Sequence, residues 1–538
     1  MKLIDFRAVF LFLLLALLFT DCAKRGMPSG GPLDTIPPSF VRSLPDNNSR
    51  NFDTQEIRIY FDEFVRLKDL NKQVIVSPPL KNRPIISPQG NSARFVKIRF
   101  MDSLLPETTY SVNFGNAIVD NNEENPLPYF KYVFSTGKYI DSLQLKGKIR
   151  NAASRTPDDF VSLMLYEVDE DYTDSIIFKE RPRYIANTLA ADTFQFDNLK
   201  AGKYRLIAVK DKASDNLYQP QNDKLGYWPQ FIDLPTDEQF ELSLFQEVLP
   251  SNIKKPSMIA EQKLLVGFEG EVEKITLKSI PEELLKEVAY YKSREADTFF
   301  VYYKPPIPIA QDSLVLNIKA PTTEADFTIF LKDLKRDSLS IKYNGKSTIN
   351  FKDPIVLSAN VPLKSIDPTK IQAITRDSTA VDFEIGIDTL YNEIQLNWKR
   401  QEEERYSFKF FPGAVTDFFE ETNDTLDLSF RTGLYSDYGT MSLSLQNVPE
   451  DYPLIVQLVD DKDKVLYEIT QLNQAVYQFD NVDSGLYFVR FIYDENSNGR
   501  LDTGNFIQKT IPERVLYMPE KLEFRANWDL MERYRLPD

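Results

Sequence analysis

Short stretches of the chain alternate apolar and polar residues, which is the pattern of strands with one buried face. In residues 56–61 the apolar positions are Ile57, Ile59 and Phe61. Residues 95–100 and 109–114 repeat the alternation. Helical periodicity is weak nearly everywhere, so the pattern predicts a protein built from β-sheets.

One segment departs from this pattern. Residues 281–292 place Leu284, Leu285, Val288 and Tyr291 along one stripe at helical spacing. The spacing predicts an amphipathic helix there.

Internal repeats define the expected architecture. The segment FQFDNLKAGKYRLIAVKDKASDN, which begins at Phe194, aligns without a gap with YQFDNVDSGLYFVRFIYDENSNG, which begins at Tyr477. In this alignment Asp211 falls on Asp494. Two further segments resemble each other. One ends at Gly137, upstream of the first copy, and the other ends at Gly433, upstream of the second. Two kinds of unit therefore alternate, and a middle segment separates the two pairs.

Each unit resembles a known β-sandwich family. The pieces IPPSFVRSLPDNN, IRIYFDEFV, LLPETTYSVNF, AIVDNNEENPL and FSTG of the first unit resemble the bacterial Ig-like domain of SbsA-type surface proteins. The other unit, around FQFDNLKAGKYRLIAVKD, resembles the transthyretin-like or carboxypeptidase-regulatory-like sandwich. These resemblances imply an all-β fold of tandem β-sandwich modules, Ig-like and transthyretin-like, in a duplicated arrangement.

The predicted order of segments follows from the repeats and from composition. Residues 23–38 are rich in Gly and Pro, as expected for a tether. The prediction comprises a signal peptide at 1–21, a lipidated Cys and tether at 22–38, Ig-like domain 1 at 39–137, transthyretin-like domain 1 at 138–236, a middle sandwich at 237–336, Ig-like domain 2 at 337–433, transthyretin-like domain 2 at 434–525 and a tail at 526–538.

The first residues have the pattern of an export signal. Lys2 and Arg7 precede an apolar run at residues 8–19, and the chain's single cysteine, Cys22, follows it. A lone cysteine at this place resembles a bacterial lipoprotein signal of the relaxed kind found in Bacteroidota, in which the cysteine carries the lipid. Phe19 and Asp21 depart from the usual motif. An ordinary secretory signal with an incidental cysteine is the alternative.

Composition excludes several functions. The 80 Asp and Glu outnumber 64 Lys and Arg, for a net charge of −16, which disfavours nucleic-acid binding. The chain contains no histidine, which removes Ser-His-Asp and Cys-His catalysis and nearly every catalytic zinc site. We therefore expect a protein that is not an enzyme and needs no cofactor, with calcium as the one candidate.

That candidate is the loop YDENSNGRLDTGN at residues 493–505. Asp494, Asn496, Asn498 and Asp502 have the spacing of a calcium loop, although Asn505 stands where a bidentate Glu is expected. The aligned loop of the first copy has Ala213 at the third position and lacks the pattern. A turn formed by Asp and Asn explains both copies, and a weak calcium site that stiffens the module is the alternative.

The resemblances imply a non-catalytic, outer-membrane-associated lipoprotein. It would act as a multi-domain scaffold or accessory subunit of an outer-membrane protein complex, such as a protein assembly or export machine, with a β-barrel protein as partner. A glycan-binding or polysaccharide-processing surface lipoprotein is the alternative. The whole chain contains only three Trp, and this small number disfavours a sugar-binding surface. The residues after Cys22 lack an acidic run, which tilts the expected location towards the periplasm without excluding the cell surface.

Overall fold

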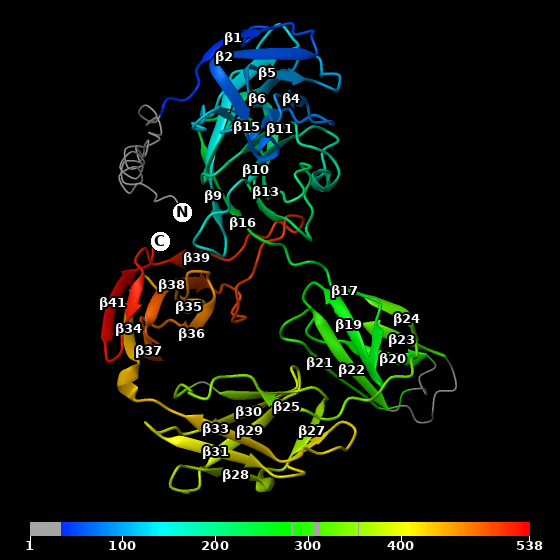
Figure 1. Cartoon of the computed structure of the whole chain (residues 1–538), viewed down its shortest axis with the longest axis vertical. Coiled ribbons are helices and arrows are strands. Elements are labelled where there is room, and N and C mark those ends of the chain that lie inside the picture. The colour runs from blue at the N-terminus through cyan, green and yellow to red at the C-terminus, as the bar shows by residue number, and fades with distance from the viewer. Residues whose placement is uncertain (1–33, 281–284, 286, 305–311, 353, 538) are drawn as a thin grey trace, which may run out of the picture. The chain divides into compact units, whose positions relative to one another are not determined.

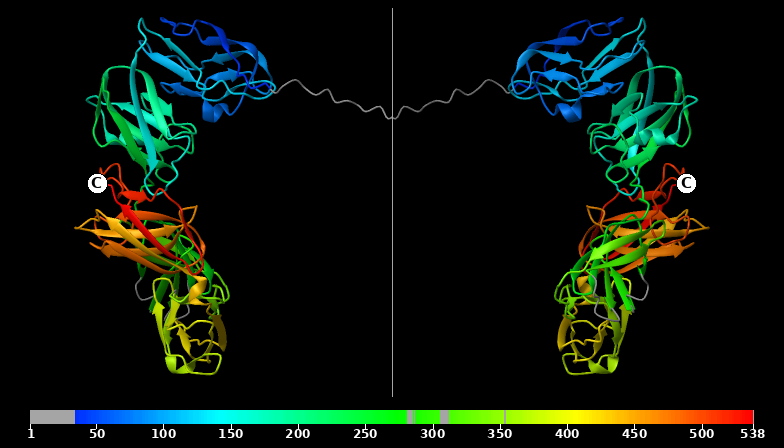
Figure 2. Two further views of the ribbon diagram at one scale, coloured as in Figure 1. Left: turned by 90° about the vertical axis from the view of Figure 1, so that its left-hand side faces the viewer. Right: turned by 90° about the vertical axis from the view of Figure 1, so that its right-hand side faces the viewer.

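The computed structural model describes residues 34–280, 285, 287–304, 312–352 and 354–537. Strands dominate this part of the chain in all three views (Figures 1 and 2). The chain divides into two compact units, residues 1–142 and residues 143–538. The predicted fold class, tandem β-sandwiches in a duplicated arrangement, is confirmed.

The first unit contains the first sandwich, in which two sheets enclose one core. Strand order is β1-β2-β5-β4, with β7 beside β2, in one sheet and β3-β6-β8 in the other. The alternation at residues 57–61 and 96–100 points into this core, where Tyr110, Tyr132 and Phe134 are also buried. The elements are β1 (Phe40–Leu44), β2 (Glu56–Leu67), α2 (Leu70–Gln73), β3 (Ile75–Ser77), β4 (Ile85–Ser87), β5 (Ala93–Arg99), β6 (Thr109–Asn113), β7 (Ile118–Asp120) and β8 (Lys131–Ser135).

The second unit begins with the second sandwich, which has strand orders β11-β10-β13-β14, with β15 beside β13, and β12-β9-β16. Its last strand pairs with β9 in parallel. The elements are β9 (Leu143–Asn151), β10 (Ser162–Glu167), η1 (Asp174–Phe178), β11 (Tyr184–Asn187), β12 (Thr193–Leu199), β13 (Gly202–Lys210), β14 (Lys224–Tyr227), β15 (Ile232–Leu234) and β16 (Gln239–Leu244).

The fifth sandwich repeats this topology strand for strand. Its orders are β36-β35-β38-β39, with β40 beside β38, and β37-β34-β41, in which β41 pairs with β34 in parallel. The elements are η4 (Tyr435–Asp437), β34 (Gly439–Gln446), β35 (Pro453–Val459), β36 (Val465–Leu472), β37 (Val476–Val482), β38 (Gly485–Tyr493), β39 (Val515–Tyr517), β40 (Leu522–Phe524) and β41 (Asp529–Arg535). The repeat seen in the sequence is thus a repeat of the fold.

The third sandwich lies between the two pairs. Its sheets run β17-β19-β22-β21, with β18 beside β19, and β20-β23-β24 around a core of its own. The elements are β17 (Asn252–Ile253), β18 (Ser257–Ala260), β19 (Lys263–Glu269), β20 (Thr276–Ile280), β21 (Glu287–Lys292), β22 (Thr298–Lys304), β23 (Ser313–Lys319) and β24 (Glu324–Phe330).

The helix predicted at 281–292 is wrong where the structure describes it. Residues 287–292 form β21, which pairs with β22 in an antiparallel hairpin. Tyr290 packs edge-on against Phe299, and Tyr291 lies beside Phe300 across the hairpin. Aromatic and β-branched residues favour a pleated surface with such cross-strand partners, and this packing outweighed the helical spacing.

The fourth sandwich has the strand arrangement of the first. Its orders are β25-β26-β30-β29, β27-β32 and β28-β31-β33. The elements are β25 (Ile341–Tyr343), β26 (Ile355–Ala359), β27 (Leu363–Ile366), η3 (Pro368–Lys370), β28 (Ile371–Ile374), β29 (Phe383–Asp388), β30 (Glu393–Trp398), β31 (Arg405–Phe410), β32 (Val415–Asp417) and β33 (Leu426–Arg431).

Two strands lie beyond segment boundaries that the sequence predicts. β16 belongs to the second sandwich, so that sandwich continues past residue 236. β41 is a strand of the fifth sandwich, and Leu536 is buried in the same core, so residues 529–536 do not form a detached tail. Both strands pair in parallel with the first strand of their sandwich, and local sequence does not reveal that pairing.

The predicted signal, the lipidated Cys22 and most of the tether lie outside the described residues. Within the described ranges, no helix is long and apolar enough to cross a membrane.

Candidate functional site

The loop after β38 is organised by Asp494. Its side chain is fully buried at the end of the strand. One carboxylate oxygen accepts the Asn498 N–H at 2.9 Å and the other accepts the Gly499 N–H at 2.8 Å. Gly499 has φ +76°, a conformation that glycine adopts without strain. The buried carboxylate therefore holds the loop in a tight turn.

The other predicted residues complete the turn. Asn496 and Asn498 both donate their side-chain N–H groups to Asp502, the latter at 2.7 Å. Their carbonyl oxygens accept backbone N–H groups, from Asn498 at 3.1 Å and from Arg500 at 3.0 Å. The structure thus brings together all four residues of the candidate calcium loop, as a network of hydrogen bonds.

A fifth residue, Glu513, lies outside the predicted set. Its two carboxylate oxygens accept the N–H groups of Glu495 at 3.0 Å and Asp502 at 2.9 Å. Burial, and then the charges of Asp502 and Asp494, raise the pKa of Glu513. In the second sandwich, the two carboxylate oxygens of Asp223 likewise accept the backbone N–H groups of Lys212 and Gln219. An acidic residue shortly before the next strand in both copies is the sequence signal that identifies this role.

These hydrogen bonds favour the turn over the metal site. Among the described residues, no group of three or more His, Cys, Asp or Glu is placed to hold a metal ion. Each side-chain oxygen of Asp494, Asn496 and Asn498 already accepts a backbone N–H. The weak calcium site stays the alternative to this turn.

The chain that follows the turn contacts the second sandwich. We call residues 494–514, between β38 and β39, the clasp; it is the orange-red connection between those strands in Figure 1. Phe506 is fully buried in a core cluster of the second sandwich. Its ring meets that of Tyr227 edge-on with centroids 5.2 Å apart. The apolar anchor of the clasp is therefore a single phenylalanine in a core to which it is remote in sequence.

Polar groups surround this anchor. Glu247 accepts the Phe506 N–H at 2.6 Å with one carboxylate oxygen and the Tyr218 hydroxyl at 2.8 Å with the other. The Tyr227 hydroxyl donates to the Thr510 carbonyl at 3.1 Å. Burial, and then the nearby Glu247 carboxylate, raise the pKa of Tyr218. The backbone groups that the clasp buries thus find partners on the second sandwich.

Charge and close packing fix the rest of the clasp. Lys509 forms an ion pair with Asp174 at 2.7 Å and lies over the Phe506 ring at 3.8 Å from its centroid. Burial opposes ionisation of Asp174, but the hydrogen bond from Lys509 is among the interactions that keep its pKa lowered. A Cβ on Gly504 would lie 2.7 Å from the Phe245 ring and 2.8 Å from the Thr510 carbonyl oxygen, so the backbone approaches more closely than a side chain permits.

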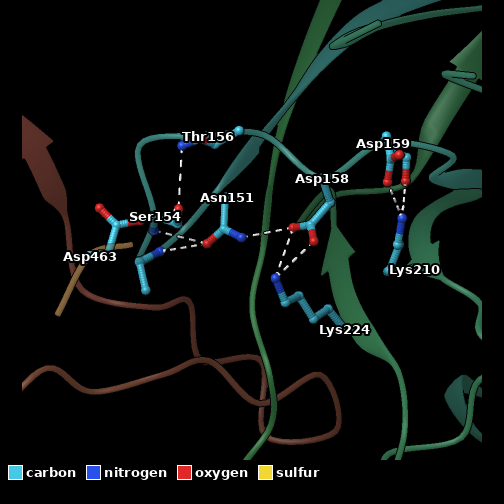
Figure 3. A network of polar contacts seen from close by, with 9 residues as sticks. Asn151, Ser154, Thr156, Asp158, Asp159, Lys210, Lys224 and Asp463 are labelled. Atoms are coloured by element: carbon cyan, nitrogen blue, oxygen red, sulfur yellow. Dashed lines mark hydrogen bonds and ion pairs between the residues drawn. The ribbon is translucent and has the colours of Figure 1, made fainter. Parts of the chain in front are cut away.

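A second contact joins the same two sandwiches. Figure 3 shows the loop after β9, where Asn151 accepts the N–H groups of Ala153 and Ser154, both at 3.0 Å. The Ser154 hydroxyl donates to Asp463 at 2.5 Å. The Ala153 carbonyl accepts from Arg490 at 3.2 Å and from the Tyr517 hydroxyl at 2.9 Å. This loop holds the fifth sandwich at a place separate from the Phe506 anchor.

A shallow pocket between the third and fourth sandwiches offers less chemistry. It is lined by residues 292–297 and Tyr391. Arg294 there is paired with Glu393 at 2.7 Å and lies 3.8 Å above the Tyr391 ring. The charged group that would attract a ligand is thus engaged within the protein.

Comparison with known proteins supports the sandwich assignment. Residues 34–136 match the family model Big_5, the bacterial Ig-like domain. The chain is therefore a multi-sandwich protein that carries a bacterial Ig-like domain. No curated protein matches it.

Three solved structures show a distant likeness to this chain. Domains 1–6 of the surface layer protein SbsC are 10% identical, with 91% of this chain and 67% of that chain covered and a TM-score of 0.16. Titin domains A168–A170 are 8% identical, with 52% and 97% covered and a TM-score of 0.14. The BSP domain of a biofilm associated protein is 8% identical, with 67% and 94% covered and a TM-score of 0.15. At these identities and TM-scores the likeness carries no conclusion about this chain.

Proposed function

We propose that this protein is a non-catalytic scaffold of the bacterial cell envelope, which holds a partner protein at a fixed geometry. The observation that carries the proposal is the clasp, because it joins the second sandwich to the fifth across more than two hundred residues of chain. A string of sandwiches joined only end to end moves at its linkers by default. Contacts between distant sandwiches limit that motion.

The clasp has the composition of a stable intramolecular contact. Closing a long stretch of chain has an entropic cost that grows only slowly with length. Burial of Phe506, the hydrogen bonds to Glu247 and Thr510, and the Lys509–Asp174 ion pair offset that cost. A rigid arrangement of sandwiches is useful to a scaffold because its binding surfaces need no further ordering when a partner arrives.

The finer assignment rests on the sequence. We propose that Cys22 is lipidated and anchors the chain to the outer membrane of a Bacteroidota-type bacterium. The second and fifth sandwiches are then transthyretin-like accessory modules. The partner is a β-barrel outer-membrane protein or complex, such as one engaged in protein assembly or export. Whether the protein faces the periplasm or the cell exterior is decided by protease treatment of intact cells, which removes it only in the second case.

The test is affinity purification of the tagged full chain from detergent-solubilised outer membranes. Stoichiometric recovery of a β-barrel protein is expected, and Cys22→Ala releases the chain from membranes washed with 1 M salt, which screens contacts of its charged surface. Phe506→Ala reduces recovery of the partner while membrane anchoring persists, whereas Ile507→Ala, at a side chain that is 54% exposed, leaves recovery unchanged. Retention of the chain on a glycan column without any protein partner contradicts the scaffold.

A further inference from the structure

The first sandwich presents an unusual outer face on the sheet β1-β2-β5-β4. Strand register places Arg42 opposite Tyr60 and Tyr60 opposite Phe95. The neighbouring outward rows hold Leu44, Arg58 and Lys97, and then Glu56, Arg99 and Ile85. The alternate positions of β2 and β5 point into the core. We call the outward set Arg42, Arg58, Tyr60, Phe95, Lys97 and Arg99 the basic face.

Cations outnumber anions on the basic face. Glu56 accepts a hydrogen bond from Arg58 at 2.8 Å and lies 3.8 Å from the Lys97 ammonium. One negative charge is therefore paired with two positive charges. Arg42 lies over the Tyr60 ring at 4.1 Å from its centroid. In the middle of β2, Asp62 accepts the backbone N–H of Ser39. Positive charge therefore remains in excess on this sheet.

Large apolar side chains are exposed on and around the basic face. Leu44, Ile85 and Phe64 are about half exposed, at 51%, 49% and 50%, and Phe95 is 37% exposed. Arg94 lies over the Phe64 ring at 5.2 Å. Aromatic rings interleaved with Arg and Lys suit an interface between water and lipid, where rings lie at the headgroup level and long basic side chains reach the phosphates.

This face stands out against the charge of the whole chain. The chain as a whole carries −16, whereas residues 34–142 contain as many basic as acidic residues. The excess negative charge therefore lies in the remaining sandwiches, which an anionic surface repels. Of the two compact units, the first is the one whose charge permits close approach to such a surface.

We propose that the basic face docks onto an anionic lipid membrane surface, with Arg42, Arg58, Lys97 and Arg99 at the lipid phosphates. The position of the face favours this occupant: β1, an edge strand of the same sheet, begins eighteen residues after Cys22, at Phe40. Eighteen residues of random coil span about 20–25 Å root-mean-square. The nearness of the face to a membrane depends on the proposed lipid anchor, whereas the charge and register of the face do not.

The test uses the chain from residue 34 to 538, which lacks the anchor segment and retains every described sandwich. Its partitioning is measured by co-sedimentation with vesicles of equal parts phosphatidylglycerol and phosphatidylcholine. We expect binding to these vesicles, none to pure phosphatidylcholine, and loss of binding in 1 M salt, where the screening length falls to about 3 Å. Failure of lipidation at Cys22 does not affect this assay, so the two proposals fail separately.

The decisive variant is Lys97→Gln/Arg99→Gln, at two outward positions of β5. Each basic residue near an anionic surface contributes about fivefold to partitioning, so the pair should weaken binding by about 25-fold. The matched control is Arg50→Gln/Lys138→Gln, which removes two exposed cations beside the opposite sheet. Equal losses in both variants, or equal binding to neutral vesicles, overturn the proposal. The proposal is also overturned if neither variant weakens vesicle binding; a protein partner is then the occupant of the face.

Discussion

Truncation of Phe506 is the sharpest test of the clasp. The side chain is fully buried against Tyr227 and Phe245 in the second sandwich, although it belongs to a loop of the fifth. Replacing a fully buried phenylalanine by alanine costs about 3–5 kcal/mol. Each of the two sandwiches has a core that does not include this residue. The loss should therefore fall on clasp closure and leave both sandwiches folded.

This free energy fixes the size of the expected effect. Since about 1.4 kcal/mol is a factor of ten, Phe506→Ala should raise the open population of the clasp by about two to three and a half powers of ten. The assay is amide hydrogen exchange of residues 503–510. In the closed form the Asn505 N–H donates to the Thr510 carbonyl at 2.8 Å, and the Thr510 N–H donates to the Asn505 carbonyl at 3.0 Å. Trypsin cleavage after Lys509, whose ammonium is paired with Asp174, gives an independent measure.

Ile507→Ala is the matched control, because Ile507 is the adjacent residue in the same loop and is 54% exposed. It should change exchange and cleavage little. If Phe506→Ala leaves residues 503–510 as protected as the control does, the clasp does not hold the two sandwiches together and the scaffold argument loses its support.

Three further predictions concern the same region. Asp494→Asn leaves one of the two N–H groups at the turn without an acceptor, so it should lower the free energy of unfolding by about 1–3 kcal/mol in urea titrations. Asp502→Asn should lower the free energy of unfolding by less, because the Asp502 carboxylate is one-third exposed. Burial raises the pKa of Tyr517 from 10 to about 12, so the stability it contributes as a neutral donor is complete below pH 10 and is lost as the pH rises towards 12. Urea midpoints should therefore fall more steeply over that window than in Tyr517→Phe. Calorimetric titration of the full chain with calcium should give no saturable heat, because among the described residues no three acidic side chains are placed to hold a metal ion. Saturable heat that Asp494→Asn abolishes would restore the calcium site.

Local patterns in the sequence predicted the strands and the repeat correctly because those patterns are short in range. The alternation at Ile57, Ile59 and Phe61 depends only on the two-residue period of a strand, and these side chains are buried as expected. The alignment of Asp211 with Asp494 found two loops that do the same work, since both carboxylates accept backbone N–H groups a few residues ahead.

The failures have a common cause, which is pairing between strands. Residues 287–292 carry a helical stripe, yet their partner is the strand β22. Residues 529–535 give no local sign that they complete a sheet with β34. In both cases pairing with another strand outweighs the local preference. The partner of residues 287–292 is the next strand of a hairpin, whereas that of residues 529–535 is β34, at the start of the same sandwich and outside any local window.

The sequence by itself determined that this protein is a series of β-sandwiches in a duplicated order and that Asp494 begins a turn. Only the tertiary structure decided what the turn is for. In the sequence, Phe506 is an ordinary apolar residue of a loop. In the structure, Tyr227, Phe245 and the Glu247 carboxylate of the second sandwich surround it. The partners of such a contact lie hundreds of residues away in the chain, and hydrophobic burial has no direction and no period by which sequence alone could pair them.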